Sequence, residues 1–195
     1  IAEQIDWLQF RLFWGYKGAS LEKILENESA RETYNNAQQL LKEVVIDGSI
    51  YVNYAIEILN AHKEQNSIVF ENGTTMPIQR SLSAKDNFIS LVDYLPTARE
   101  IPVGIFCVTA KDTHHHCDCK SYSHLMRQAL CARLAEAATA WLHETIYNDI
   151  NSMRPAFGYP MCPDHSLKRT AFDILNAETR LGVSLTDSYA INPST

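Results

Sequence analysis

The chain has 195 residues, of which 46% are hydrophobic and 21% charged, and its formal charge is −6. This composition is typical of a globular protein with one sizeable core. The acidic balance and the lack of long Lys/Arg runs argue against nucleic-acid binding, and no apolar run approaches the roughly 18 residues of a membrane span. Five cysteines without the spacing of a disulfide framework favour reduced thiols and a cytoplasmic location.

The N-terminal part predicts an aromatic-rich opening followed by a helix. Residues 5–16 contain five aromatic side chains. Ser29 and Glu32 then have the spacing of a capping box, and apolar residues recur at helical spacing after them. The pair Asp47 and Gly48 is expected to end this helix.

The central part of the chain predicts a block of strands. Its segments are enriched in β-branched and aromatic residues, which favour strands. Asn72-Gly73 lies between two such segments and is typical of a tight hairpin turn. The predicted strands cover residues 50–52, 67–70, 88–94 and 102–109.

Two further helices are predicted after the strands. The longer one runs from about Ser121 to Tyr147 along an apolar stripe, and the other lies near Asp164 to Leu181, with Gly182 as its end. The seven glycines form neither the Gly-x-Gly-x-x-Gly nor the P-loop spacing, which disfavours a Rossmann methyltransferase or a nucleotide hydrolase. We therefore predict a single α+β domain, with a twisted, mainly antiparallel sheet and flanking helices, not a Rossmann fold.

Residues 154–165, here named the proline loop, carry the most informative chemistry. Three prolines restrict φ and bias the preceding residues to extended conformations, so the loop is expected to be stiff. Gly158 allows backbone to approach a bound group, and Arg154 offers a planar fork of donors that suits a carboxylate. From these residues alone, a cradle for a small ligand and a structural connector are equally expected.

The proline loop reads Arg-Pro-Ala-x-Gly-Tyr-Pro-x-Cys-Pro-Asp-His and contains the motif Arg-x-x-x-Gly-Tyr. It resembles the S-adenosylmethionine loop of the activation domain (reactivation domain) of cobalamin (vitamin B12)-dependent methionine synthase. Three other segments resemble the same family in the same order and extend the resemblance over nearly the whole chain, although residues 45–120 match only loosely. They are residues 5–7 (Ile-Asp-Trp), 122–144 and 185–190 (Leu-Thr-Asp-Ser-Tyr-Ala).

The resemblance implies which residues contact S-adenosylmethionine. Arg154 is implied to hold the methionyl carboxylate, Asp6 to meet the polar end of the ligand, such as its ammonium, and Glu136 to lie near the ligand. One arginine and two carboxylates complement a ligand that has one carboxylate and two cationic centres. The residues implied to contact the ligand largely through their backbone are Ala156, Gly158 and Tyr159.

Asp6 and Glu136 also have simpler interpretations. Without the resemblance, Asp6 would be an N-cap of the first helical turn, and Glu136 a solvated carboxylate on a helix face. In favour of the ligand role, Ala132 and Ala140 lie one turn on either side of Glu136 and leave room against that face.

The resemblance implies a repair function in which the domain presents the sulfonium methyl to reduced cobalamin after inactive cob(II)alamin has formed. A partner module or subunit would hold the cobalamin, and flavodoxin or another flavoprotein would supply the electron. Positioning is sufficient for this transfer, so no catalytic side chain is expected. One aromatic contact of the family would come from beyond Thr195, so the domain formed by residues 1–195 is expected to be incomplete at its C-terminal end.

Two other functions remain open at this stage. A shorter segment before Arg154, which lacks an acidic residue of the family, and the expected missing C-terminal part are compatible with a non-catalytic docking module for a corrinoid protein. Residues 114–119 read His-His-His-Cys-Asp-Cys and, with Cys162 and His165, could bind zinc or copper. This segment has no Cys-x-x-Cys pair and is expected to be a polar loop, so we predict no metal site.

Overall fold

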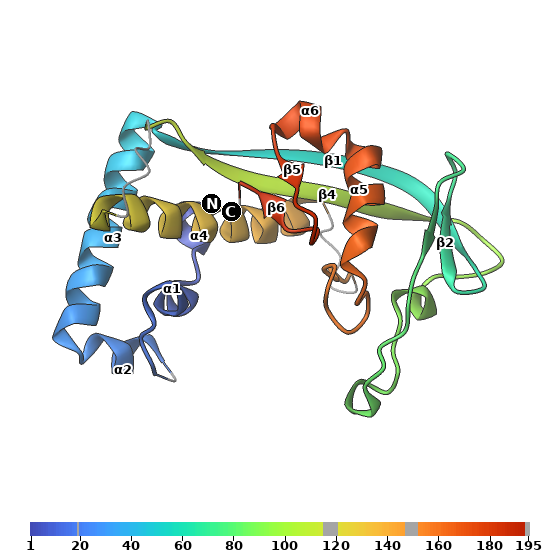
Figure 1. Cartoon of the computed structure of the whole chain (residues 1–195), viewed down its shortest axis with the longest axis horizontal. Helices are drawn as coiled ribbons and strands as arrows, with labels where there is room; N and C mark the ends of the chain where they lie inside the picture. The colour runs from blue at the N-terminus through green and yellow to red at the C-terminus, as the bar shows by residue number, and fades with distance from the viewer. Residues whose placement is uncertain (19, 115–120, 147–151, 194–195) are drawn as a thin grey trace. The chain divides into compact units, whose positions relative to one another are not determined.

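A computed structural model of the chain combines helices with a four-stranded sheet (Figure 1). The predicted α+β class with a mainly antiparallel sheet, as opposed to a Rossmann fold, is confirmed. The structure describes residues 1–18, 20–114, 121–146 and 152–193.

Within the domain, the described residues group into two compact units. The long strands β1 (Ile50–Glu64) and β4 (Ile101–Asp112) contribute residues to both units. The first unit takes the described residues of Ile1–Asn53 and Val108–Asp149, and the second unit takes those of Tyr54–Cys107 and Ile150–Pro193.

The sheet has the strand order β3-β2-β1-β4. β1 pairs antiparallel with β2 (Ser67–Phe70), and β2 pairs antiparallel with β3 (Thr75–Pro77). The predicted turn at Asn72 and Gly73 is confirmed, because Gly73 has a φ of +83° and donates its N–H to the Phe70 carbonyl at 2.9 Å. β1 continues far beyond the three residues predicted for it, since cross-strand pairing also carries its polar second half.

Aromatic packing organises the N-terminal helices of the first unit. The aromatic opening, for which only a first helical turn capped by Asp6 was considered, forms α1, and its Trp7 packs edge-on against Tyr34 at 5.3 Å between ring centroids. α3 begins directly after its N-cap Asn27, whose side chain accepts a hydrogen bond from the Ala30 N–H at 3.0 Å, so the predicted capping box at Ser29 is wrong. The helices of this unit are η1 (Ala2–Gln4), α1 (Trp7–Trp14), α2 (Leu21–Leu25), α3 (Glu28–Asp47) and α4 (Tyr122–Ile146).

The long helix α4 confirms the predicted helix over 121–147 within its described residues, and it forms much of the core of the first unit. Leu130 and Ala137 are buried on α4 and pack in one cluster with Val44 of α3 and Ile50 of β1. A buried ion pair joins the same helix to the end of β4: Arg127 donates to Asp112 through Nε at 2.6 Å and through Nη2 at 2.7 Å.

The second unit departs from the sequence prediction at two places. The predicted strand over 88–94 is wrong, since Asn87 and Phe88 have positive φ values and a 3-10 helix follows with a local capping box. The predicted helix over 164–181 is interrupted at Asn176, whose left-handed conformation asparagine tolerates. Gly182 ends the last helix with a φ of +61°, as expected.

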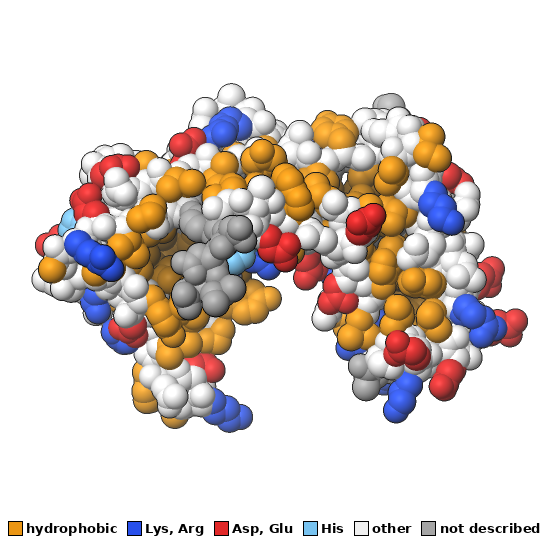
Figure 2. Space-filling view, turned by 180° about the vertical axis from the view of Figure 1, so that it is seen from behind, with side chains coloured by type: hydrophobic (Ala, Val, Ile, Leu, Met, Phe, Trp, Pro, Cys, Tyr) orange, Lys and Arg blue, Asp and Glu red, His pale blue; other side chains and the backbone are white. Residues whose placement is uncertain are grey.

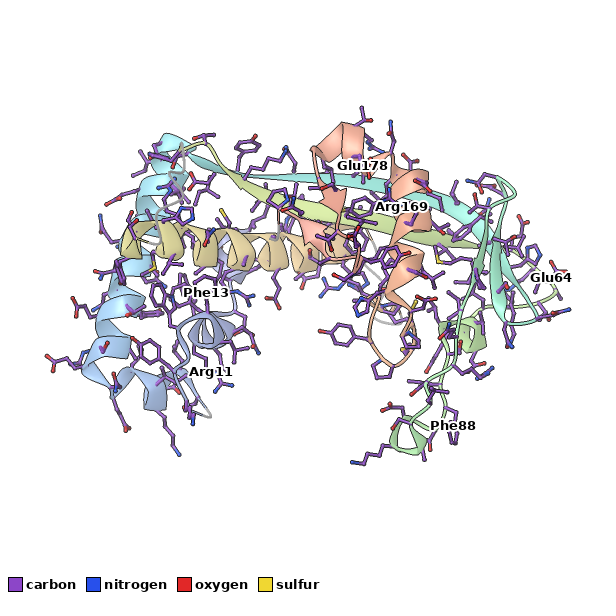
Figure 3. All side chains as sticks on the ribbon, viewed as in Figure 1. Arg11, Phe13, Glu64, Phe88, Arg169 and Glu178 are labelled. Carbon is purple, nitrogen blue, oxygen red and sulfur yellow. The ribbon has the colours of Figure 1, made fainter. Side chains whose placement is uncertain are left out.

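The remaining elements of the second unit are short. Arg169 of α5 and Glu178 of α6 point toward one another in Figure 3 and form an ion pair at 2.8 Å. The elements are η2 (Ala84–Asp86), η3 (Leu91–Tyr94), η4 (His165–Leu167), α5 (Lys168–Leu175), α6 (Ala177–Leu181), β5 (Ser184–Leu185) and β6 (Ile191–Asn192), the last two paired as a small antiparallel sheet.

Two surface properties bear on function. On the face shown in Figure 2, acidic and basic side chains are interspersed, with hydrophobic side chains between them. None of the helices in the described part of the chain combines the length and the apolar character needed to cross a bilayer.

Candidate functional site

The proline loop is closed by hydrogen bonds of its own backbone. Gly158 donates its N–H to the Cys162 carbonyl at 2.8 Å, and Cys162 donates its N–H back to the Tyr159 carbonyl at 2.8 Å. Tyr159 donates to the Ala156 carbonyl at 3.3 Å, which closes a turn around Gly158. These bonds, together with the three prolines, make the loop a stiff structure, as the sequence predicts.

The inner side of the proline loop is anchored in the second unit. Cys162 is only 2% exposed and belongs to the main core cluster there, and burial, followed by the nearby Asp164, raises the pKa of its thiol to about 11. The Leu91 N–H donates to the Met161 carbonyl at 2.8 Å, and Asp164 caps η4 through the Ser166 N–H at 2.8 Å. The loop therefore has a fixed base, which is what a ligand cradle requires.

The outer side of the proline loop carries the predicted ligand contacts. Arg154, Ala156, Gly158 and Tyr159 are all exposed, and Tyr159 keeps 66% of its surface accessible. Among the residues that the structure describes, none forms a hydrogen bond or an ion pair with the Arg154 guanidinium. Its donors are therefore not occupied by another described side chain, and a contact with a ligand carboxylate stays a prediction.

Asp6 has a structural role in the first unit. Its Oδ1 accepts hydrogen bonds from the N–H groups of Leu8 at 2.9 Å and Gln9 at 3.3 Å, which makes it the N-cap of α1. The N-cap interpretation is thus confirmed. A carboxylate has lone pairs for further partners, so capping is compatible with a ligand contact as well.

Glu136 lies on α4 with 54% of its side chain exposed, and Arg133 one turn earlier forms an ion pair with it. This agrees with the simpler interpretation of a solvated carboxylate on a helix face. An exposed pair of this kind is weak, so a cationic ligand group could compete for the carboxylate.

The six predicted residues fall into two groups. Arg154, Ala156, Gly158 and Tyr159 share one loop of the second unit, whereas Asp6 and Glu136 belong to the first unit. Within the first unit, Ile5 packs in one cluster with Leu134 and Ala135 of α4. Asp6 follows Ile5 and Glu136 follows Ala135, so the segments that carry the two carboxylates lie side by side. Joint contact of both groups with one ligand stays a prediction.

His165, the last residue of the proline loop, and Lys168, which follows the loop, have a structural role that the sequence did not single out. The His165 ring lies directly over Gly158, and the Lys168 ammonium reaches the His165 Nδ1 at 3.1 Å. The i, i+3 spacing of a histidine and a lysine at a helix start is the one sequence signal that could have suggested the contact between His165 and Lys168.

Two of the described side chains that were considered as metal ligands have other structural roles. His114 lies with its Nδ1 2.9 Å from Arg127 Nη2, beside the buried ion pair, and Cys162 is enclosed in the core of the second unit. No cluster of three metal-ligating side chains occurs in the described ranges. The rest of the run, from His115 through Cys117 to Cys119, lies outside the described residues.

Comparison with known proteins agrees with the resemblance seen in the sequence. The chain is similar to a crystal structure of the MetH reactivation domain bound to AdoHcy, with a TM-score of 0.81 and 25% sequence identity over 97% of this chain and 71% of that chain. The fold is thus that of a reactivation domain. The family model for the activation domain of vitamin B12-dependent methionine synthase matches residues 1–195, and the chain belongs to this family.

Proposed function

We propose that this chain binds S-adenosylmethionine and supplies its methyl group for the reductive reactivation of cob(II)alamin in cobalamin-dependent methionine synthase. Family membership supports the reactivation role. The similar MetH domain binds AdoHcy, the molecule that remains once the sulfonium has given up its methyl group. The observation that carries the proposal is the exposed Arg154 guanidinium on a stiff loop, without a carboxylate partner among the described residues.

In this proposal, the side chains divide the charges of the ligand between them. Arg154 holds the methionyl carboxylate through a bidentate contact, while Asp6 and Glu136 face the cationic centres. The backbone of Ala156, Gly158 and Tyr159 lines the remainder of the ligand, because a closed turn without a Cβ at Gly158 lets the main chain come close. No proton moves in the transfer, so these residues act by orienting the methyl group.

The remaining parts of the reaction lie outside this chain. Cobalamin, held by the cobalamin-binding module that the family implies as partner, supplies the reduced cobalt that accepts the methyl group. We further propose that flavodoxin or another flavoprotein supplies the electron. Residues 1–195 act as one activation domain in this proposal, in the cytoplasm, and the free thiols of Cys107, Cys131 and Cys162 are consistent with that location.

Calorimetric titration with S-adenosylhomocysteine and S-adenosylmethionine tests the proposal. We expect both ligands to bind the wild type and Arg154→Ala to weaken binding by ~2 kcal/mol, about 30-fold, because a charge-assisted bidentate contact is lost. Arg99→Ala removes another exposed arginine of the second unit and serves as the matched control, with unchanged affinity expected.

Each negative result has a definite meaning. An Arg154→Ala variant with wild-type affinity removes this residue from the site. A wild-type protein that gives no binding heat with either ligand favours the docking module over the methyl-donor domain. Thermal unfolding of both variants checks that the changes act on the ligand and not on the fold.

A further inference from the structure

The His165 ring lies against Gly158 on the side where a Cβ would point. Its φ of +93° is a value that residues with side chains rarely adopt. A Cβ built at this position would overlap Cε1 and Nε2 of His165 and would lie 2.9 Å from its Nδ1. The imidazole therefore fills the space that any larger residue at position 158 would need.

The lysine one helical turn later holds the imidazole in place. Lys168 Nζ lies 3.1 Å from His165 Nδ1 and donates to the Tyr189 carbonyl at 2.9 Å. A charged ammonium only donates hydrogen bonds, so this contact requires His165 Nδ1 to be the acceptor. Partial burial lowers the pKa of Lys168.

The Tyr189 carbonyl, which accepts the hydrogen bond from Lys168, is itself held by a closed turn. Tyr189 has a φ of +59°, which is uncommon for a residue with a side chain. Its N–H donates to the Thr186 carbonyl at 2.9 Å, and the Thr186 N–H donates to the Ala190 carbonyl at 2.9 Å. The turn between β5 and β6 thus directs the Tyr189 carbonyl at Lys168.

We propose that His165 and Lys168 are positioning residues for the proline loop. Lys168 ties the His165 ring to the turn at Tyr189, and the ring holds Gly158 in the conformation that presents Arg154 and Tyr159 to a ligand. The inference rests on the proposed function, because it concerns the same loop and the same ligand. It also gives a physical role to residues 185–190, which resemble the family although none of the proposed ligand contacts lies among them.

A double-mutant cycle in the 195-residue chain tests this inference with S-adenosylhomocysteine as the probe. We expect His165→Ala and Lys168→Met each to raise the dissociation constant about tenfold, and the double variant to match the single ones, because both break the same connection. Arg169→Met is the matched control, since it removes the neighbouring cation, whose ion pair with Glu178 (Figure 3) lies outside this connection. Its affinity should stay within about twofold of wild type.

Nuclear magnetic resonance of the unliganded protein gives a second readout that does not depend on ligand binding. In the wild type, the imidazole nitrogens of His165 should show the tautomer with the proton on Nε2. Lys168→Met should give a mixture of tautomers and shift the amide resonance of Gly158, while Arg169→Met should leave both unchanged. A purely structural lysine would lower the unfolding temperature without changing the affinity of the folded protein.

The two readouts separate this inference from the proposed function. If the wild type fails to bind S-adenosylhomocysteine, the proposed function fails, and the Gly158 amide alone decides whether Lys168 controls the loop. An unchanged Gly158 resonance in Lys168→Met overturns the inference in either case. Where the wild type does bind, unchanged affinity in Lys168→Met also overturns it, as does a double variant whose loss is the product of the two single losses.

Discussion

The two units of this chain use arginine in contrasting ways. In the first unit, Arg127 and Asp112 form a bidentate pair whose side chains are 11% and 5% exposed. In the second unit, Arg80 and Asp93 form a bidentate pair with similar distances, 2.8 and 2.5 Å, but their side chains are 42% and 36% exposed. Arg154 of the second unit has no such partner among the described residues.

The difference separates arginines that serve the fold from one that is available to a ligand. A buried pair cannot lose one member without leaving a charge in the interior, whereas an exposed pair exchanges its partner for water. Arg127 and Arg80 both have a protein carboxylate, so their positions are explained by the fold. Arg154 lies on a loop that is closed by backbone hydrogen bonds, so the fold does not need the charge of its guanidinium. The absence of such a structural role favours a function of Arg154 in ligand binding.

The largest loss of stability is expected when the buried ion pair of the first unit loses its arginine. Arg127→Met leaves the Asp112 carboxylate enclosed without its bidentate donor and also removes the contact of 2.8 Å to the Ser49 hydroxyl. We expect the free energy of unfolding to fall by about 3 kcal/mol or more. Urea unfolding followed by circular dichroism measures it.

A double variant provides the control for this experiment. Asp112→Leu combined with Arg127→Met removes both charges and replaces them with apolar groups, so it should recover part of the stability lost in the single variant. If Arg127→Met unfolds within about 1 kcal/mol of wild type, the buried pair behaves like a surface pair, and the contrast between the two units is wrong.

A smaller effect is expected at the exposed pair. Arg80→Met should lower the unfolding temperature by less than about 3 °C, because solvent screens this pair. The Arg80 guanidinium holds the pKa of Asp93 below its ordinary value, so the stabilisation is present above that value and is lost as the pH falls through the lowered pKa. Thermal unfolding at a series of pH values should therefore show the difference from wild type at pH 6 and its decline below about pH 4. A difference that grows on acidification would contradict this assignment.

The smallest effect is expected at the thiols, and it compares the core of the first unit with the base of the proline loop. Burial, with a smaller contribution from Asp112, raises the pKa of Cys131 to about 12, and burial likewise raises that of Cys162 to about 11. Since the thiolate is the reactive form, iodoacetamide at pH 8 should modify neither residue until urea unfolds the protein. Peptide mass spectrometry gives the extent of modification. Rapid modification of Cys162 alone would mean that the loop opens readily and is not the stiff structure described above.

The parts of the fold that the sequence predicted are those with strong local patterns. The apolar stripe of α4, the turn at Asn72 and Gly73 and the end of the last helix at Gly182 all follow from local chemistry. The predicted strand over 88–94 failed because local hydrogen bonds of Ser90 and Asp93 compete with a sheet ladder. The full length of α1 was not predicted beyond a first turn at Asp6, because its aromatic side chains pack against residues distant in the sequence.

The candidate site was predicted in a similarly uneven way. The motif in the proline loop located Arg154, Gly158 and Tyr159 in one exposed turn, because a continuous segment keeps its residues together. The capping role of Asp6 was one of two interpretations that the sequence left open, and the geometry of α1 settles that role. The position of the His165 ring over Gly158 could not be predicted, since this contact depends on the positive φ of Gly158 itself.

The location of the tryptophans in the first unit also means that the intrinsic fluorescence of the chain reports on that unit. All three indole rings, Trp7, Trp14 and Trp141, belong to that unit, and two of them contact tyrosines at 5.3 Å. Tryptophan emission therefore follows the melting of one half of the chain, while the half that contains the proline loop contributes no indole signal. A change in tryptophan emission on addition of a ligand therefore reports on the first unit and not on the proline loop itself.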